Sequence, residues 1–486
     1  MSKILAHLEP ARVWQHFEDI CQIPRPSKKE ERILNYLIAF AEKHGLSWQQ
    51  DKIGNLLISK PAAKGYEDRS AVVLQSHVDM VCEKNADTAH DFDHDPILPR
   101  LDNGWVRATG TTLGADDGIG MAVQLAILES DSIAHGPIEC LFTVDEETGL
   151  TGAFALEKGF VKSRILLNLD SEDDGELFIG CAGGIDTLVT FPYEKVAPEA
   201  DHQAFRVSVT GLKGGHSGDD INRGRGNANK ILNRLLWNFE KMFELRLAEI
   251  QGGNLRNAIA REAFASFTIP KRHVSGLRGG FDKLVSDIRD EQKTNEPGLA
   301  IAFEEAVMPQ ALIDFSTQKR LLNALYACPH GVIAMSPDIP NLVETSTNLA
   351  SVKMTPGEII VSTSQRSSLE SGKRDIADMV TSVFSLAGAK VKHGDGYPGW
   401  KPNVNSEILA IMRKAYTGLF KEEPKVLAIH AGLECGLIGE KYPGIDMISY
   451  GPTIKGAHSP DEGIKIDTVQ KFWDLTLEVL KNIPKV

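Results

Sequence analysis

The first part of the chain, up to about residue 185, alternates between two hydrophobic periodicities. Apolar residues with helical spacing occupy 13–21, 30–44 and 118–129. Short apolar runs bounded by polar or turn residues occupy 71–74, 138–144 and 165–169. Strands that alternate with helices predict a mostly parallel sheet that is covered on both faces. In such sheets, functional groups gather beyond the carboxyl ends of the strands.

The pattern changes near Asp186. Residues 205–210 alternate like a half-buried strand and are followed by the glycine-rich segment 211–218 (GLKGGHSG) and a helical stretch. Two further alternating runs, 349–354 and 358–363, are separated by a Pro-Gly turn. These features predict antiparallel strands with helices on one face, which is an α+β module.

The segment 393–402 is rich in Gly and Pro and is typical of a linker. After it the α/β pattern resumes and closes with an amphipathic helix that begins at Asp467. We therefore predict an α/β fold with a mixed, mostly parallel sheet flanked by helices. Residues 1–185 and 400–486 would form one discontinuous domain, and residues 186–399 an inserted α+β lid domain.

Composition and charge limit the classes of partner. The 486 residues are 42% hydrophobic and 24% charged, which is ordinary for a globular protein. The net charge of −13 argues against nucleic acid and anionic membrane surfaces as partners. We see neither a signal peptide nor a run of the ~18 apolar residues that span a bilayer, so we expect a soluble, cytoplasmic protein. The six scattered cysteines predict neither a disulfide framework nor a thiolate zinc site.

Two pairs of polar residues are candidates for metal binding. His77 and Asp79 follow the run at 71–74 and point the same way if that strand continues. A His with a neighbouring carboxylate resembles a metal ligand and the acid that orients it. Asp116 and Asp117 lie in a glycine-flanked loop before a helix, where an Asp is commonly an N-cap. One cap accounts for one of the pair and leaves the other available as a ligand.

Further acids follow the next two predicted strands. Glu146 and Glu147 come directly after one of them, where a solvated loop is the simpler interpretation because adjacent acids repel each other. Asp170 closes the other strand and could equally cap a helix. The prediction depends on five groups together: His77, Asp116, Glu147, Asp170 and His458. Two imidazoles and three carboxylates suit Zn, Mn or Co, and one bridging carboxylate would let them hold two ions.

The densest His and Asp cluster of the chain is a different segment, HDFDHD at 90–95. Its residue types suit a metal ion. It lies in a polar stretch between elements, however, and its charges crowd one another. We predict that this segment is a surface loop.

The motifs SHVDM, GADDGIG, DEETGL, LD and GAHSP occur in an order and at a spacing that resemble the M20 family of co-catalytic zinc peptidases. LGADDGIG, GLKGGHSG and HAGLECG at 430–436 are similar to its aminoacyl-histidine dipeptidase branch, also called cytosol non-specific dipeptidase or peptidase D. The resemblance covers nearly the whole chain, without a departure at the metal or catalytic positions.

The resemblance implies a role for each metal-site residue. Asp116 would bridge two divalent ions, with His77 and Asp170 on one ion and Glu147 and His458 on the other. These ions would be Zn, for which Co or Mn could substitute. Two further residues would be catalytic: Asp79 would orient His77, and Glu146 would be the general base.

The resemblance also assigns residues of the predicted lid. GLKGGHSG lacks the G-K-[ST] ending of a phosphate-binding loop and could be a tight turn with an incidental histidine. The resemblance implies instead that His216 stabilises the oxyanion, from its own subunit or from the partner of a homodimer. Arg366 would bind the terminal carboxylate of the substrate, although a solvated strand residue fits the sequence equally well. Gly432 and Asn257 would be further substrate contacts.

The activity that the resemblance implies is metal-dependent hydrolysis of dipeptides with broad specificity, including Xaa-His dipeptides such as β-alanyl-histidine. One alternative is an amidohydrolase of N-acyl amino acids, since M20-like sites also serve deacylation. Another is a non-catalytic metal-binding protein. Glu146 argues against the latter, because a base beside the metal has no use in an inactive site.

Overall fold

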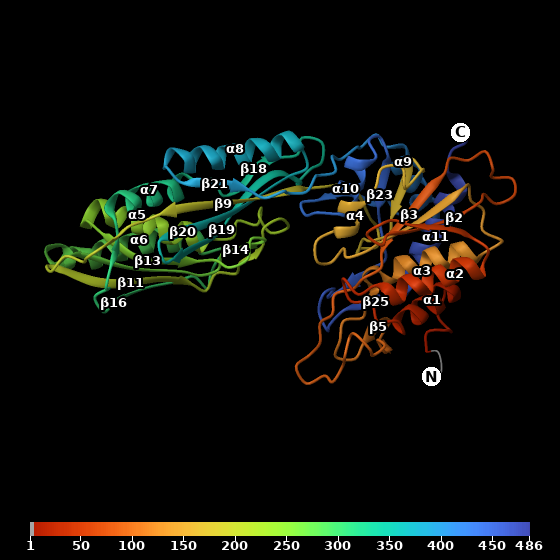
Figure 1. Cartoon of the computed structure of the whole chain (residues 1–486), viewed down its shortest axis with the longest axis horizontal. Helices are drawn as coiled ribbons and strands as arrows, with labels where there is room; N and C mark the ends of the chain where they lie inside the picture. Colours follow the sequence, from red (N-terminus) through yellow and green to blue (C-terminus); the bar gives the residue numbers. More distant parts are fainter. Residues whose placement is uncertain (1–3) are drawn as a thin grey trace. The chain divides into compact units, whose positions relative to one another are not determined.

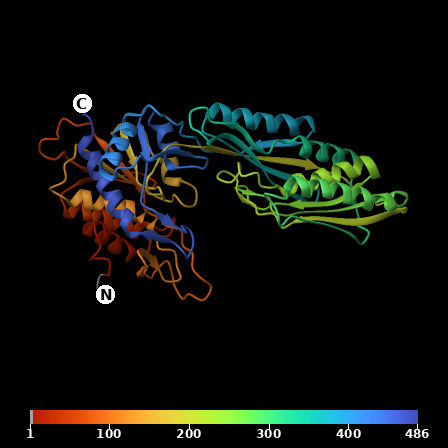
Figure 2. The same cartoon turned by 180° about the vertical axis from the view of Figure 1, so that it is seen from behind.

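The computed structural model describes residues 4–486, which form two compact units. The first unit contains the chain up to Cys181 together with Trp400–Ala428 and Leu433–Val486. The second unit contains Ala182–Gly399 and Ile429–Gly432. The chain ends in the first unit, at the blue terminus in Figures 1 and 2. No helix within residues 4–486 is long and apolar enough to cross a membrane.

An eight-stranded sheet forms the centre of the first unit. In spatial order its strands are β1 (Ser47–Gln50), β2 (Leu56–Lys60), β6 (Ile138–Thr143), β3 (Val72–His77), β7 (Ile165–Asn168), β23 (Asp446–Ser449), β8 (Glu176–Cys181) and β22 (Lys425–Ile429). The four central strands β6, β3, β7 and β23 run parallel, whereas β2 is antiparallel to β6 and β8 is antiparallel to β23. This confirms the predicted mixed, mostly parallel sheet.

Helices cover both faces of this sheet. They are α1 (Ala11–Cys21), α2 (Glu31–Lys43), α3 (Ala115–Glu129), α4 (Thr151–Ala155), α9 (Glu407–Phe420), α10 (Glu434–Lys441) and α11 (Ile466–Asn482). On β3, Ser76 donates a hydrogen bond to Gln124 of α3, and the adjacent Gln75 donates one to Glu434 of α10. Successive strand residues point to opposite faces, so α3 and α10 lie on opposite sides.

Helix α3 is buried on all sides because it lies between the sheet and α1. Its residues 118–128 are all buried. A small sheet joins the segment that precedes α3 to the one that precedes α11. Its order is β24 (Ile454–Lys455), β25 (Gly463–Lys465), β5 (Trp105–Ala108) and β4 (Pro99–Asp102).

The second unit is built on one antiparallel sheet. Its strands are β16 (Ala300–Glu305), β11 (His202–Thr210), β15 (Ala263–Pro270), β13 (Arg246–Gly252), β19 (Val343–Thr355), β20 (Glu358–Ser367), β9 (Gly183–Pro192) and β21 (Lys390–His393), with β18 (Gly331–Met335) also paired to β19. Two short pairs accompany it: β10 (Lys195–Val196) with β17 (Leu312–Ile313), and β12 (Gly215–His216) with β14 (Ala258–Ile259).

The helices of the second unit pack on one face of its sheet (Figure 1). They are α5 (Ala228–Phe243), α6 (Val274–Gln292), α7 (Phe315–Ala327) and α8 (Glu370–Leu386), with the 3-10 turn η1 (Lys271–His273) before α6. The strands show why: Val207 and Phe205 on β11 are buried, while Arg206 between them is exposed. This alternation leaves one face for a hydrophobic core, as the sequence pattern predicts.

Candidate functional site

The five predicted metal ligands lie at the carboxyl edge of the parallel strands. His77 is the last residue of β3, and Asp170 follows β7 by two residues. Glu147 follows β6 in the loop before α4. Asp116 lies at the start of α3, and His458 in the turn between β24 and β25. Segments far apart in the sequence therefore meet at one edge of the sheet.

The carboxylate of Asp116 lies between the two imidazoles. Its Oδ1 is 2.9 Å from His77 Nε2, and its Oδ2 is 3.2 Å from His458 Nε2. Asp170 Oδ1 is 3.5 Å from His77 Nε2, and Glu147 Oε2 is 3.1 Å from His458 Nε2. Two groups of three possible ligands result, each with one imidazole and two carboxylates, and Asp116 belongs to both.

Opposite charges hold this cluster together. Burial alone would lower the pKa of His77, but the charge of Asp170 and the hydrogen bond with Asp116 raise it well above its ordinary value. Hydrogen bonds with Asp116 and Glu147 raise the pKa of His458 to about 11. Both imidazoles thus lie in a field that stabilises positive charge. Divalent cations bound to the same nitrogen and oxygen atoms would satisfy that field equally, so the donor set fits such ions.

Glu147 supplies a second observation that fits a cation. Its Oε1 is buried and has no hydrogen-bond partner in the part of the chain from residue 4 onward. A third group of possible ligands combines His77 with both Glu146 and Glu147. The distances therefore allow either glutamate to face the His77 side, and the different roles of the two remain a prediction.

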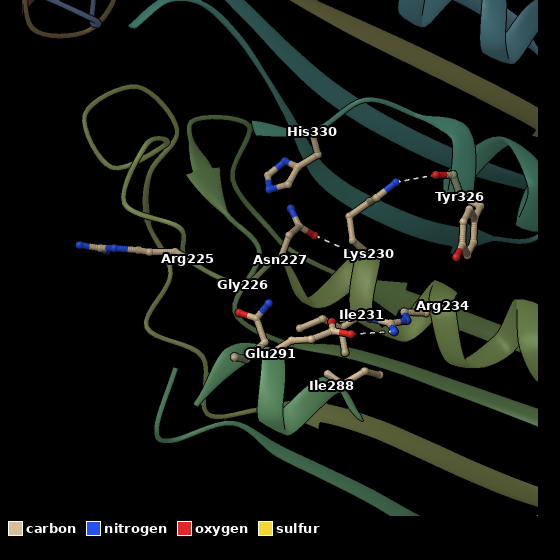
Figure 3. Close-up of a pocket in the computed structure, with 11 residues that line it drawn as sticks. Arg225, Gly226, Asn227, Lys230, Ile231, Arg234, Ile288, Glu291, Tyr326 and His330 are labelled. Carbon is tan, nitrogen blue, oxygen red and sulfur yellow. Dashed lines mark hydrogen bonds and ion pairs between the residues drawn. The ribbon is translucent and has the colours of Figure 1, made fainter. Parts of the chain in front are cut away.

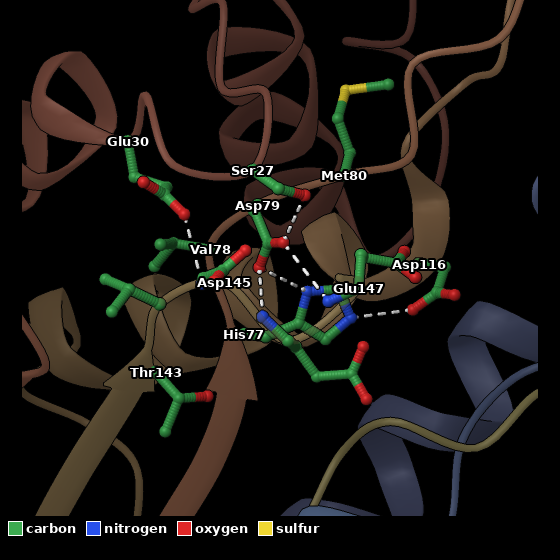
Figure 4. Close-up of polar contacts among 12 residues, drawn as sticks. Ser27, Glu30, His77, Val78, Asp79, Met80, Asp116, Thr143, Asp145 and Glu147 are labelled. Carbon is green, nitrogen blue, oxygen red and sulfur yellow. Dashed lines mark hydrogen bonds and ion pairs between the residues drawn. The ribbon is translucent and has the colours of Figure 1, made fainter. Parts of the chain in front are cut away.

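Asp79 contacts more than His77 (Figure 4). It is fully buried, and its Oδ1 is 3.4 Å from His77 Nδ1. The same carboxylate accepts the backbone N–H groups of Glu146 and Glu147 at 3.0 and 3.3 Å, and the hydroxyl of Ser27 at 2.7 Å. Burial would raise its pKa, but the interactions with His77 lower it to about 2. Asp79 thereby fixes the loop that carries both glutamates, which the sequence does not reveal.

The carboxyl group of Glu146 has a strongly raised pKa. Burial is the largest cause, and the charges of Asp170, Glu434 and Glu147 add to it. A carboxylate whose pKa lies closer to neutrality is better suited to accept and return a proton. This environment is consistent with the predicted general base.

Asp117 has a different role from its neighbour. Its side chain is buried, and its Oδ1 accepts the backbone N–H of Gly120 at 3.0 Å. It therefore caps the regular part of α3, while Asp116 faces the two imidazoles. One cap and one candidate ligand is the division that the sequence left open.

Glu434 is a buried acid beside this centre. Its Oε2 accepts hydrogen bonds from Gln75 Nε2 at 2.6 Å and Thr143 Oγ1 at 2.8 Å. Burial raises its pKa to about 7. Gln75 lies two residues before His77 on β3, and Thr143 pairs with His77 across β3 and β6. Glu434 thus belongs to a polar layer beneath the candidate ligands.

His216 and Arg366 lie together in the second unit. His216 ends β12, and its Nε2 is 3.5 Å from Arg366 Nη2 on β20. Its Nδ1 is 3.1 Å from Asp219 Oδ2. Arg366 Nη1 donates a hydrogen bond to the hydroxyl of Tyr397 at 3.0 Å. The guanidinium is therefore held in place beside the imidazole.

Gly432 and Asn257 are placed differently. A Cβ atom on Gly432 would lie 2.9 Å from a ring carbon of Tyr397, so glycine leaves room for the ring that holds Arg366. Asn257 is exposed just before β14, and its carbonyl accepts the N–H of Ser217 at 2.8 Å. The structure thus brings Gly432 close to the Arg366 group, while Asn257 contacts the loop that follows His216.

A cavity of about 370 Å³ in the second unit contains none of the predicted site residues (Figure 3). Its lining is partly cationic, yet Arg234 is paired with Glu291 at 2.6 Å. Lys230 donates to the carbonyl oxygens of Leu325, Tyr326 and Cys328. These cations support the local fold rather than offer a site for an anion.

The HDFDHD segment forms turns between β3 and β4. His94 Nδ1 is 3.0 Å from Asp91 Oδ2, and Asp93 pairs with Lys29 at 2.6 Å. Both acids and His94 remain accessible to solvent. The segment is a surface loop with local pairs, as the sequence predicts.

Comparison with known proteins gives consistent matches. The model of peptidase family M20/M25/M40 matches residues 73–482. The cytosol non-specific dipeptidase of Escherichia coli (strain K12) is 43% identical over 480 residues, 99% of either chain. The crystal structure of aminoacylhistidine dipeptidase from Vibrio alginolyticus superposes with a TM-score of 0.95 at 47% identity, covering 100% of this chain and 99% of that one.

A more distant structure has the same fold. Aminopeptidase PepT from Bacillus cereus ATCC 10987 matches with a TM-score of 0.58 at 16% identity, over 98% of this chain and 99% of that one. The family match covers most of the chain, and the bacterial relatives cover nearly all of it. These matches confirm the resemblance that the motifs indicate, and the chain belongs to peptidase family M20/M25/M40.

Proposed function

We propose that this protein is a metal-dependent dipeptidase of broad specificity that also accepts Xaa-His dipeptides. The observation that carries the proposal is the Asp116 carboxylate between His77 and His458, which gives two ligand groups with one shared member. The names of the two relatives, at 43% and 47% identity over their full lengths, support the choice of substrate.

His77, Asp116 and Asp170 would hold one divalent ion, and Asp116, Glu147 and His458 the other. Imidazole and carboxylate donors favour Zn, and Co or Mn would fit the same atoms. When bound, the two ions lower the pKa of the attacking water and polarise the scissile carbonyl.

Glu146 would take a proton from the attacking water and return it to the leaving amine. Its raised pKa supports this assignment because the acceptor must also act as a donor in the second step. Asp79 would keep the base in place, since its carboxylate accepts the N–H of Glu146 at 3.0 Å.

The second unit would supply the groups that bind the substrate. His216 would donate a hydrogen bond to the oxyanion, an interaction typically worth about 3 kcal/mol. Arg366 would pair with the terminal carboxylate and thereby limit the substrate to short peptides. Asn257 and Gly432 would be further contacts.

We also propose a cytoplasmic homodimer. Support for the location is the word cytosol in the name of the Escherichia coli relative. Support for the dimer is strand β18, whose large apolar residues Val332, Ile333 and Met335 are exposed. Sedimentation of the purified chain would test the dimer, and a monomer at micromolar concentration would contradict it.

A substrate panel on the metal-reconstituted enzyme tests the activity. It contains β-alanyl-histidine, other Xaa-His dipeptides, glycyl dipeptides and N-acetyl amino acids. We expect turnover of the dipeptides and little of the N-acetyl amino acids. Preferential hydrolysis of the latter would indicate an amidohydrolase instead, and no turnover of either class would indicate a non-catalytic metal-binding protein.

A further inference from the structure

A buried carboxylate, that of Glu462, holds the backbone of the loop that leads into α3. Its Oε2 accepts the N–H groups of Leu113 and Gly114 at 2.8 and 3.0 Å. Its Oε1 accepts the N–H of Ala115 at 2.7 Å and lies 3.4 Å from the nitrogen of Asp116. Glu462 is only 2% exposed, so no solvent replaces these bonds. One side chain thus holds three consecutive amides directly before the candidate bridging ligand.

Arg25 holds the same loop from its other side. Its Nη2 donates to the carbonyl oxygen of Gly114 at 2.5 Å, and its Nη1 donates to the carbonyls of Val78 and Asp79. The N–H of Gly114 therefore donates to the buried carboxylate of Glu462, and its carbonyl oxygen accepts from the buried guanidinium of Arg25. Because the chain continues from Val78 back to β3, Arg25 also ties this loop to the end of the strand that carries His77.

Glu462 belongs to the same turn as His458. The turn is closed by the N–H of Glu462, which donates to the carbonyl of Ser459 at 3.0 Å, and by Ser459, which donates to Gly456. His458 has a φ of +62°, a left-handed conformation that is strained for a residue other than glycine. Such a conformation persists only when its surroundings hold it. The bonds of Glu462 anchor the end of this turn.

We infer that Glu462 is a positioning residue that locks the loop of Asp116 to the turn of His458, and so sets the affinity of one metal position. That position is the group formed by Asp116, Glu147 and His458. The inference rests on the proposed metal centre. The other position shares Asp116 but depends less on Glu462, because its two remaining ligands are held by the sheet: His77 ends strand β3, and Asp170 follows strand β7 closely.

The chemistry of the carboxylate makes it hard to replace. All three amides need an acceptor, because a buried N–H without one is costly. A carboxylate presents two oxygens and no hydrogen. The amide of glutamine has the same size, yet its NH₂ group would point at one set of N–H donors. Glu462→Gln should therefore release one side of the loop without leaving a void.

Glu139 offers a matched control in the first unit. It is a buried acid whose Oε2 accepts the backbone N–H groups of Lys162 and Ser163 at 3.0 and 2.8 Å. It belongs to none of the candidate ligand groups. Glu139→Gln thus makes the same chemical change to a similar backbone contact away from the metal centre.

The test measures both zinc dissociation constants of the full chain, by competition with a chromophoric chelator and without any substrate. We expect Glu462→Gln to weaken one of the two zinc positions about 10- to 100-fold, the range seen when a group that orients a ligand is removed. The other position, which shares Asp116, should lose clearly less affinity, and Glu139→Gln should change neither position. Glu462→Asp, which keeps both oxygens on a shorter side chain, should give an intermediate loss.

The inference would be overturned if Glu462→Gln bound zinc at both positions as tightly as the wild type does, or if both positions lost affinity equally. If that variant does not fold, the same criteria apply to Glu462→Asp, whose folding is checked by circular dichroism. Zinc binding is independent of turnover. A wild-type chain that binds two zinc ions but cleaves no dipeptide would therefore contradict the proposed activity alone.

Discussion

The two histidines of the candidate metal centre and two histidines of the second unit have opposite electrostatic environments. In the first unit, nearby carboxylates raise the pKa of both His77 and His458. In the second unit, burial lowers the pKa of His430 to about 3, with the charge of Arg366 adding to the effect, and burial lowers that of His330 to about 4. Burial by itself always disfavours the imidazolium form. The contrast shows that neighbouring charges, rather than burial alone, decide whether the surroundings of an imidazole favour its protonated form.

Metal removal should have the largest effect and should act on the first unit. Without cations, the carboxylates of Asp116, Glu147 and Asp170 face one another at short range. We expect a chelator to abolish dipeptide hydrolysis and to lower the thermal unfolding midpoint, and Zn, Co or Mn to restore both. Activity that survives complete depletion, verified by elemental analysis, would refute the metal mechanism.

Glu146→Gln tests whether Glu146, whose pKa is raised by its surroundings, is the general base. Glutamine keeps the size of the side chain but cannot carry a proton between water and amine. We expect kcat to fall about 10² to 10⁴-fold, the usual contribution of a general base. Zinc content, measured on the same sample, should stay at the wild-type level. Near-normal turnover would reject Glu146 as the base and would favour its neighbour Glu147.

A pH titration of stability tests the contrast in the second unit. The pKa of His330 is about 4 in the folded protein, whereas an exposed imidazole has an ordinary pKa of 6.5. The unfolded chain therefore binds the proton first, so the stability from this group is present above pH 6.5 and is lost as the pH falls through 4. The loss amounts to about 3 kcal/mol over that window.

The measurement for His330 is urea unfolding at about pH 7.5, 5.5 and 4.5, which covers most of the titration window, with His330→Gln as the reference. The metal centre titrates in both proteins, so it cancels in the difference between their unfolding free energies. That difference should shrink as the pH falls. A difference that stays constant with pH would mean that His330 is not held neutral.

Arg366→Lys, a substitution in the second unit, should have the smallest effect on free energy of these four changes. Lysine keeps the charge but loses the paired hydrogen bonds of the guanidinium. We expect KM for dipeptides to rise roughly tenfold, or about 1.4 kcal/mol, while kcat changes little. Dipeptide amides, which lack the carboxylate, serve as the control. An equal loss with dipeptides and their amides would show that Arg366 does not bind that group.

Much of the architecture is readable from the sequence because periodicity reports burial. The apolar runs at 71–74, 138–144 and 165–169 correspond to β3, β6 and β7. The convergence of His77 and Asp170 then follows from parallel strands that share an edge. The predicted fold class and family are confirmed, while the roles of the individual site residues remain predictions.

Other features could not be predicted, because they depend on contacts between residues far apart in the sequence, several of which involve backbone groups. Ser27 and Arg25 look like ordinary members of an N-terminal segment, yet they bind Asp79 and the loop before α3. Glu462 resembles a surface acid in the motif HSPDE. Its three amide partners lie far earlier in the chain, at separations of 347 to 349 residues. No local pattern reports such a contact.

The glycines of LGADDGIG leave space that neighbouring side chains occupy. A Cβ on Gly114 or Gly118 would lie 2.6 or 2.8 Å from Arg25 Nη2, and a Cβ on Gly120 would lie 2.4 Å from Asp117 Oδ1. Arg25 stands 89 positions before Gly114. Substitutions at Gly114 or Gly118 and at Arg25 are consequently coupled rather than additive. A redesign of this motif has to treat residue 25 as part of it.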